Sequence, residues 1–231
     1  MSKAMVVLSG GQDSTICLHW ALINYKEVET ISFNYGQKHS LELKSAIKIS
    51  ELNDVKHTII NIPDILKSRS PLTNNKEQLE EYNNYEEMDK IIGDRVELTF
   101  VPMRNAFFLT LATNIALSKD IKTLITGVCE QDNANYPDCR DTFIRSQELT
   151  INLALDTTDF KIVTPLMFLS KKESIELSIK MNKCIESLSY SHTCYAGLFP
   201  PCGKCHACVL RAQGFKEAGV PDPLIERSKN V

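Results

Sequence analysis

The chain has 231 residues, of which 43% are hydrophobic and 24% are charged, a composition typical of a globular protein and not of a disordered or fibrous one. Its formal net charge is −3, from 26 Lys and Arg against 29 Asp and Glu, which argues against a chain-wide electrostatic affinity for nucleic acid or an anionic membrane. The longest nearly apolar stretch, Ala106 to Leu117, is too short for a membrane span and predicts a buried helix, so we expect neither a nucleic-acid nor a membrane partner.

The first part of the sequence alternates short apolar runs with helical patterns. These patterns predict strands at Ala4–Leu8, Val28–Tyr35 and Lys56–Ile62, and helices at Ser14–Asn24 and His39–Asn53. The run Ala4–Leu8 is too short for the apolar core of a secretory signal, so a cytoplasmic location is expected. Strands that alternate with helices of this length favour βαβ units and a parallel sheet.

Regular patterning lapses between Pro63 and Glu97, a segment rich in Asn, Glu and Lys. An irregular connection of this length is typical of a functional lid or of disorder, and the sequence leaves both open. We treat residues 63–97 as a mobile lid or insert. The fold resumes with Leu98–Pro102, a helix at Arg104–Lys119 and a strand at Lys122–Gly127.

The remaining elements are shorter. Helices are predicted at 141–155, 170–181 and 209–218, and a strand at 160–163. Asp141 is placed to cap the first of these helices, and Ser170 with Glu173 forms an S-x-x-E capping box for the second. We therefore expect an α/β fold, doubly wound around a mainly parallel five-stranded sheet, in residues 1–185, with a small helical element in residues 186–231 packed on it.

A glycine pair follows the first predicted strand, at the sheet edge where α/β folds bind ligands. The segment reads Leu8, Ser9, Gly10, Gly11, Gln12, Asp13, Ser14, Thr15. Glycines allow a tight turn close to an anion, and the next helix offers unpaired N–H groups, so the pattern predicts a phosphate-binding loop. A Walker loop would need a lysine after the glycines, and no G-x-G-x-x-G is present. The alternative is a glycine turn in which Asp13 or Ser14 is an ordinary helix cap.

The eight cysteines divide into two groups. Four lie close together near the C-terminal end and are interpreted as metal ligands: Cys194, Cys202, Cys205 and Cys208. Four thiolates suit a closed, structural Zn²⁺ site, and an iron–sulfur cluster is the rival interpretation. His192 and His206 are interpreted as surface residues or neighbours of the ligands. The scattered Cys17, Cys129, Cys139 and Cys184 are interpreted as small buried hydrophobes, of which only Cys139 lies in a candidate active-site loop.

A polar loop at residues 130–141 follows the strand that ends at Gly127, at the same sheet edge as the glycine pair. Asp138 or Asp132 could accept hydrogen bonds from an amidine-like base edge, and Tyr136 could stack on a ring. Arg140 or Arg104 could pair with a carboxylate. Each residue alone could equally belong to a solvated turn.

The S-G-G-x-D-S pattern closely resembles the PP-loop of the N-type ATP pyrophosphatases, and a wider set of segments resembles the 7-cyano-7-deazaguanine synthase family of queuosine biosynthesis. The matching segments are L-S-G-G-Q-D-S-T at 8–15, Y-G-Q-K-H at 35–39, V-P-M-R-N at 101–105, G-V at 127–128, Y-P-D-C-R at 136–140, the four clustered cysteines, and G-V-P-D-P at 219–223. Two features depart from the family pattern: Met103 stands where a glycine is expected, and the acidic stretch from Glu77 to Glu87 looks longer than usual.

The resemblance implies an adenine nucleotide alpha hydrolase-like fold and conversion of 7-carboxy-7-deazaguanine to the nitrile with ATP, Mg²⁺ and ammonia, through an adenylated acid and an adenylated amide. It implies one structural Zn²⁺ per chain and a homodimer. Asp13 and Ser14 would be catalytic, and the substrate contacts would be Arg104, Asp132, Tyr136, Asp138 and Arg140. The ATP-binding residues would be Leu8, Ser9, Gly10, Gly11, Gln12, Asp13, Ser14, Thr15, Ile16, Cys17 and Leu18.

Three other functions are compatible with a phosphate loop beside a cysteine-rich element. One is a tRNA-thiolating enzyme, although the net charge of −3 and the lack of a basic run weigh against it. Another is an adenylating ligase or transferase that stops at the amide or passes the activated deazaguanine to another acceptor. The third is a non-catalytic, zinc-stabilised nucleotide sensor.

Overall fold

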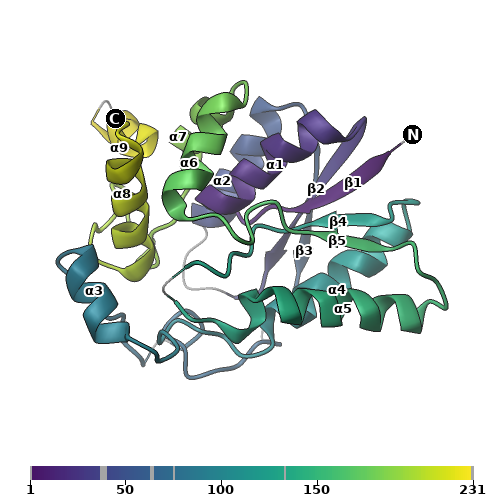
Figure 1. Cartoon of the computed structure of the whole chain (residues 1–231), viewed down its shortest axis with the longest axis horizontal. Coiled ribbons are helices and arrows are strands. Elements are labelled where there is room, and N and C mark those ends of the chain that lie inside the picture. The colour runs from purple at the N-terminus through teal and green to yellow at the C-terminus, as the bar shows by residue number, and fades with distance from the viewer. Residues whose placement is uncertain (1, 37–40, 63–64, 75, 133, 230–231) are drawn as a thin grey trace.

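The structure is a computed structural model that describes residues 2–36, 41–62, 65–74, 76–132 and 134–229 (Figure 1). Some residues singled out above lie outside the described residues: Gln37, Lys38, His39, Pro63 and Asn133. Within the described part, no helix combines the length and the apolar character needed to cross a bilayer.

A five-stranded parallel sheet forms the centre of the molecule, which confirms the predicted fold class. The strands are β1 (Lys3–Val7), β2 (Glu27–Asn34), β3 (Lys56–Asn61), β4 (Thr123–Ile125) and β5 (Lys161–Val163), in the order β3-β2-β1-β4-β5. Val6 of the central strand lies opposite Thr30 on one side and Ile125 on the other. Because the chain moves outward from β1 first in one direction and then in the other, the carboxyl end of β1 lies at the switch point of the sheet.

Helices cover both faces of the sheet (Figure 1). One face carries α1 (Gln12–Asn24), α2 (Leu41–Leu52), α6 (Lys171–Lys180) and α7 (Cys184–Tyr190), and the other carries α4 (Arg104–Leu117) and α5 (Asp141–Ala154). Each face has its own apolar core. Ile16, Ile49 and Leu188 belong to the first core, and Leu109 and Ile151 belong to the second.

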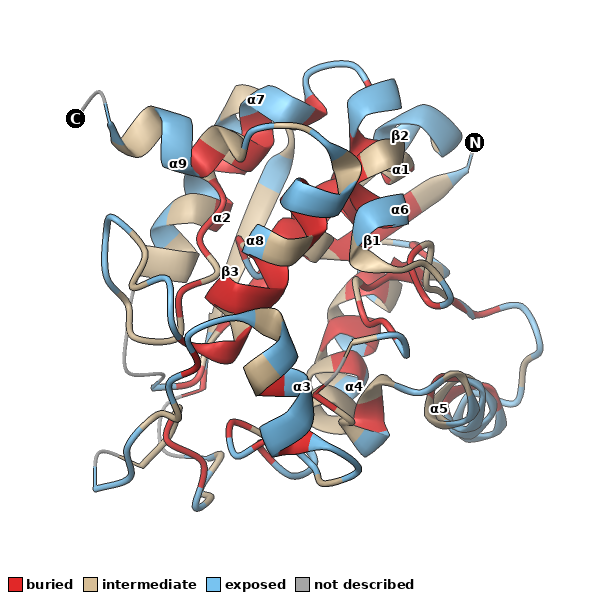
Figure 2. Ribbon diagram, turned by 60° about the vertical axis from the view of Figure 1, so that its left-hand side comes forward, coloured by how far each residue is buried: buried red, intermediate tan, exposed pale blue. Residues whose placement is uncertain are grey.

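The C-terminal part adds α8 (His206–Ala218) and α9 (Pro223–Ser228) beside this layered fold. Figure 2 shows that α8 is buried along much of its length, whereas α5 is largely exposed. A third apolar cluster joins α8 to α3 (Tyr85–Ile92), with Met88 and Ile92 against Val209 and Leu210. Tyr82 also belongs to this cluster, and its backbone N–H donates to the carbonyl of Lys204.

The segment at residues 63–97 therefore contains a helix that the periodicity analysis missed. With eight residues, α3 is shorter than the window over which helical periodicity is read, although Asn84 caps it by accepting from the N–H of Glu87. The short helices α7 and α9 were missed for the same reason. A lid role for this segment and a domain division at residue 185 remain predictions.

The predicted helix caps had different outcomes. The capping box of Ser170 and Glu173 is confirmed in both of its hydrogen bonds. The prediction for Asp141 is wrong, because Arg140 occupies the cap position and Asp141 is the first helical residue. The backbone N–H of Asp141 donates instead to the carboxylate of Glu130, which a purely local pattern could not reveal.

Candidate active site

The glycine-rich loop after β1 packs closely against two other segments. Gly10 has a φ of +91°, and a Cβ atom added there would lie 2.1 Å from the main-chain oxygen of Glu42 in α2. At the end of β4, a Cβ on Gly127 would lie 2.9 Å from the backbone of both Asp13 and Ser14. Only glycines permit these approaches, which bring the loop, α2 and the chain after β4 together.

Hydroxyl groups hold the loop in shape. Ser9 Oγ accepts from the N–H of Gly11 at 3.2 Å and lies 3.0 Å from Ser14 Oγ, while Thr15 Oγ1 donates to the carbonyl of Gly11 at 2.7 Å. Gln12 is 2% exposed, and neither polar atom of its amide has a hydrogen-bond partner among the described residues. A buried amide without partners is costly unless a ligand satisfies it.

Six of the eleven predicted ATP-binding residues line a cavity of about 320 Å³: Leu8, Ser9, Gly11, Gln12, Asp13 and Ser14. Ile16, Cys17 and Leu18 instead pack in the apolar core with no exposed surface. These three residues hold α1 against the sheet and do not line the cavity. Assignment of each residue to ATP remains a prediction.

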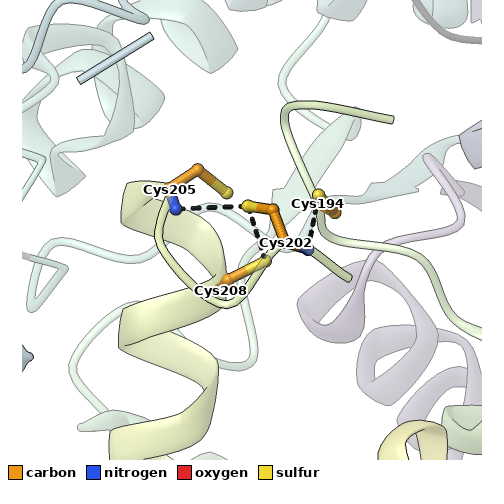
Figure 3. A group of neighbouring side chains, drawn as sticks. All are labelled: Cys194, Cys202, Cys205 and Cys208. Carbon is orange, nitrogen blue, oxygen red and sulfur yellow. Dashed lines mark hydrogen bonds between the residues drawn. The ribbon is translucent and has the colours of Figure 1, made fainter. Parts of the chain in front are cut away.

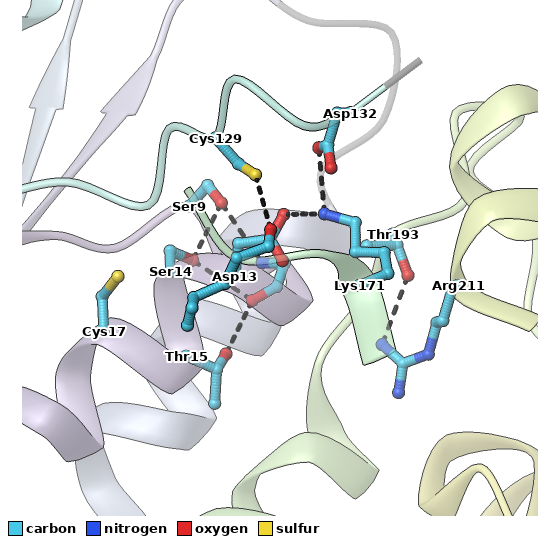
Figure 4. A network of polar contacts seen from close by, with 12 residues as sticks. Ser9, Asp13, Ser14, Thr15, Cys17, Cys129, Asp132, Lys171, Thr193 and Arg211 are labelled. Atoms are coloured by element: carbon cyan, nitrogen blue, oxygen red, sulfur yellow. Dashed lines mark hydrogen bonds and ion pairs between the residues drawn. The ribbon is translucent and has the colours of Figure 1, made fainter. Parts of the chain in front are cut away.

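A lysine in the cavity wall bridges two carboxylates (Figure 4). Lys171 Nζ lies 2.7 Å from Asp13 Oδ2 and 2.9 Å from Asp132 Oδ2, and its side chain is 11% exposed. Burial opposes the charge of Lys171, but the two carboxylates outweigh burial and raise its pKa above the ordinary value. The other oxygens, Asp13 Oδ1 and Asp132 Oδ1, are buried without a hydrogen-bond partner among the described residues.

In the sequence Lys171 is recognisable only as part of the capping-box helix, so its bridging position was not predicted. One signal was available: this lysine is the first residue of the helix that follows β5, at the same sheet edge as the glycine-rich loop. The partner of the lysine could not be known, because Lys171 and Asp13 are 158 positions apart.

Arg104 begins α4 and lines the cavity. Burial acts against its charge, but electrostatic interactions with Tyr35, Tyr136, Tyr195 and Asp138 together outweigh burial and raise the pKa of Arg104. The preceding Met103 has a φ of 65°, in the left-handed region that favours glycine. This conformation explains why a glycine is the expected residue at position 103.

Tyr136 lines the cavity, and its hydroxyl group forms hydrogen bonds with other protein residues. The hydroxyl donates to Glu97 Oε2 at 3.3 Å and lies at hydrogen-bond distance from Thr99 Oγ1. Its ring packs against Phe100 with the ring centroids 5.5 Å apart. Tyr136 can therefore offer its ring to a ligand, whereas its hydroxyl is already used. Glu97, which is 2% exposed, was missed by the sequence analysis.

The other predicted substrate residues lie in different places. Asp132 and Arg140 line the cavity together with Arg104 and Tyr136. Asp138 does not line it; this aspartate is buried, and its Oδ2 accepts from the N–H of Asn105 at 3.3 Å. Whether any of the five touches a substrate remains a prediction.

One cavity-lining carboxylate was not considered in the sequence analysis. Glu42 lies in the first turn of α2, next to the glycine-rich loop. Burial raises the pKa of Glu42 to about 7, although the positive charge of Arg104 acts in the opposite direction.

The four clustered cysteines converge at the start of α8 (Figure 3). Their Sγ atoms all lie within 4.8 Å of one another. Backbone N–H groups of Tyr195, Cys202 and Cys205 donate to these sulfur atoms at 3.4 Å. Four converging thiols with N–H donors around them form a donor set that fits a tetrahedral Zn²⁺ ion.

The cysteine-rich element also forms part of the cavity wall, through Thr193, Cys194, Tyr195, His206 and Arg211. Arg211 holds this wall in place. Its guanidinium forms two hydrogen bonds with Asp222, at 2.6 and 2.8 Å, and its Nη1 donates to Thr193 Oγ1 at 3.3 Å.

Histidines near the cluster are not at the surface. His192 and His206 are both 3% exposed, so the surface interpretation is wrong. The backbone N–H of His192 donates to the carbonyl of Gly10, which ties the cysteine-rich element to the glycine-rich loop. Among the scattered cysteines, Cys17, Cys129 and Cys184 are buried as predicted, whereas Cys139 is half-buried and lines the cavity.

Known proteins resemble this chain over almost its whole length. A family model described as queuosine biosynthesis protein QueC matches residues 3–219. A 7-cyano-7-deazaguanine synthase of Laribacter hongkongensis is 45% identical over 232 residues, covering 99% of this chain and 96% of the relative. A protein of the same name from Chromobacterium violaceum is 44% identical, covering 97% and 94%. Among solved structures, a 4-thiouridine synthetase in complex with RNA and bound ATP aligns with a TM-score of 0.49 and 17% identity, over 99% of this chain and 53% of that one.

Proposed function

The chain belongs to the family of queuosine biosynthesis protein QueC, and from this membership we propose that it is an ATP-dependent ligase that makes 7-cyano-7-deazaguanine from 7-carboxy-7-deazaguanine and ammonia. The observation that carries the proposal is the cavity in which the glycine-rich loop, the Asp13–Lys171–Asp132 bridge, Arg104 and Tyr136 converge. One end of that cavity suits a triphosphate, and the other offers an aromatic ring and guanidinium groups for a planar acid.

The chemistry needs activation because a carboxylate is a poor electrophile and its oxygen a poor leaving group. Attack of the substrate carboxylate on the α-phosphorus of ATP gives an acyl adenylate and pyrophosphate. Ammonia then displaces AMP to give the amide, with loss of a proton from nitrogen. A second adenylation, of the amide oxygen, lets that oxygen leave as AMP while nitrogen loses its remaining protons and the nitrile forms. Each product therefore uses two ATP molecules.

The described residues would act mainly by positioning and electrostatics. Backbone N–H groups at the start of α1 would bind phosphate oxygens. Lys171 would neutralise the charge that builds up at the α-phosphorus. Arg104 or Arg140 would pair with the substrate carboxylate, and Tyr136 would stack on the heterocycle. Asp13 and Ser14 are the residues for which we propose a catalytic role within the loop.

Two metal ions complete the proposal. The buried Asp13 Oδ1 and Asp132 Oδ1 are carboxylate oxygens, the ligand type that Mg²⁺ prefers, and they would hold a Mg²⁺ ion that neutralises the diphosphate. Cys194, Cys202, Cys205 and Cys208 would hold one structural Zn²⁺ per chain. Because four thiolates leave no coordination position for water, this ion would stabilise the cavity wall and take no part in the reaction. A homodimer and a cytoplasmic location remain expectations.

The test is mass spectrometry of the purified protein with ATP, Mg²⁺, ammonium and 7-carboxy-7-deazaguanine, which separates acid, amide and nitrile. We expect nitrile together with AMP and pyrophosphate. Amide alone would replace the proposal with an adenylating amide ligase. Unchanged acid would return the tRNA-thiolating enzyme and the nucleotide sensor to consideration.

A further inference from the structure

Glu42 is a carboxylate of the cavity wall that forms no salt bridge with another described residue, so it can accept hydrogen bonds from a ligand. Within the part of the chain that the structure describes, Asp13 and Asp132 are both bound to Lys171. Glu130 accepts from the backbone N–H of Asp141. The salt bridges between described residues do not include Glu42, although its side chain lines the same cavity.

The main chain fixes the position of Glu42. Its carbonyl oxygen is one of the atoms against which Gly10 packs, so the first turn of α2 is held directly on the glycine-rich loop. Arg104 reaches the cavity from α4, on the opposite face of the sheet, and its charge acts on Glu42. Both side chains line the same cavity, Glu42 as a hydrogen-bond acceptor beside the glycine-rich loop and Arg104 as a donor from the first turn of α4.

We propose that Glu42 and Arg104 together recognise the pyrimidinone edge of the deazaguanine. This inference rests on the function proposed above. The edge presents one carbonyl oxygen, one ring N–H and one amino group in a row. An ionised carboxylate only accepts hydrogen bonds and a guanidinium only donates them, and two ligand N–H donors at Glu42 would favour its ionised form. Glu42 accepts from the ring N–H and the amino group, and Arg104 donates to the carbonyl oxygen.

This assignment changes the roles of three other residues. Glu42 replaces Asp132 and Asp138 as the acceptor for the base edge, because Asp132 binds Lys171 through Oδ2 and its Oδ1 is proposed to bind Mg²⁺, and Asp138 lies outside the cavity wall. Arg140 is then the guanidinium that pairs with the substrate carboxylate. That carboxylate belongs to the five-membered ring, on the side of the ligand away from the amino edge, so binding the amino edge at Glu42 leaves it available to Arg140.

The test measures binding by calorimetry with Mg²⁺ and α,β-methylene ATP, an analogue that cannot release pyrophosphate. The ligands are 7-carboxy-7-deazaguanine and the same compound without its 2-amino group. Wild-type protein should bind the first at least roughly tenfold more tightly, because the second leaves the carboxylate short of a donor. Glu42→Gln should lose most of this preference, since its amide presents an N–H to the ligand donors, and should bind the ATP analogue with affinity within about threefold of wild type.

A matched control lies on the same helix. Glu51→Gln removes an exposed carboxylate of α2 and should keep the wild-type preference. A folded Glu42→Gln that still prefers the 2-amino compound would overturn the inference and leave the proposed function intact. If Glu42→Gln does not fold, the N1-methylated substrate decides with wild-type protein alone: weak binding supports the inference, and undiminished binding overturns it. Wild-type protein that binds neither acid would overturn the proposed function as well.

Discussion

Lys171 and Asp13 form a salt bridge of 2.7 Å between residues 158 positions apart in the chain. It joins the first turn of α6 to the first turn of α1, and so connects the chain after β5 with the loop after β1. Since Asp132 shares the same ammonium, one side chain fixes two loops of the cavity.

Removal of this ammonium should slow adenylation strongly and also lower stability, because two buried carboxylates lose their partner. We expect folded Lys171→Met to form AMP at least ~100-fold more slowly, because the charge that develops on phosphorus would lose the cation proposed for it. The measurement is AMP release under saturating ATP. Lys172→Met is the control, since Lys172 is exposed and pairs with Glu176. Equal rates in the two variants would contradict a role for Lys171.

Gly10→Ala should prevent the loop from forming. The added methyl group would clash with the main chain of α2, and the alanine would have to keep a positive φ. Together these effects should lower the free energy of unfolding by more than ~3 kcal/mol. Gly219→Ala is the matched control, because Gly219 has φ 70° and ψ 25°, in the left-handed region, and nothing lies within 4 Å of the new Cβ, so only about 1 kcal/mol should be lost. Urea unfolding of both variants measures the difference, and similar losses would show that packing on α2 is unimportant.

Met103→Gly should stabilise the protein. Relief of a left-handed conformation at a non-glycine residue is worth about 1 kcal/mol, which corresponds to roughly 2–4 °C in Tm for a chain of this size. Asp120→Gly, at a φ of 56°, should gain less because aspartate tolerates this region better. Scanning calorimetry compares the two. A fall in Tm for Met103→Gly would mean that the methionine side chain has a packing role.

Metal analysis should find one zinc ion per chain in the purified protein. Cys208→Ser should lose the ion and lower Tm, whereas Cys184→Ala, which changes a buried cysteine away from the cluster, should retain it. Visible absorbance with iron in place of zinc would instead identify an iron–sulfur cluster.

Two substitutions at Tyr136 separate the ring from the hydroxyl. Tyr136→Phe should lose about 1–2 kcal/mol of stability, because Glu97 loses a donor, but should bind 7-carboxy-7-deazaguanine within about threefold of wild type. Tyr136→Ala should weaken that binding roughly tenfold through loss of the ring. Equal affinities for both variants would argue against stacking.

Patterns within short segments were enough to predict the sheet and the position of the glycine-rich loop. Alternating apolar runs identify parallel strands, and the glycine pair after Leu8 identifies a phosphate loop, because each signal is complete within about ten residues. The spacing of the four clustered cysteines likewise predicts a metal site.

The parts that were missed depend on contacts between distant segments. The hydrogen bond from the N–H of Asn105 to Asp138 Oδ2 joins two separate segments, and the loop that contains Asp138 gives no sign of it. Lys171, Glu97 and Glu42 looked like ordinary charged residues until the fold brought them to the cavity or to Tyr136. No local pattern specifies such pairings, because they depend on which strand ends the topology places side by side.

The cavity wall that carries Arg211 is synthesised after the glycine-rich loop, so the complete site can form only late in synthesis. The glycine-rich loop leaves the ribosome first, but Lys171 follows more than 150 positions later, and Asp222, which holds Arg211, later still. At typical elongation rates of ~5–20 residues per second, the loop would wait on the order of ten seconds or more for these partners. A nascent or truncated chain that stops before α8 therefore has the nucleotide-binding motif without its enclosing wall, and the most recognisable motif of this protein is not sufficient to make its site.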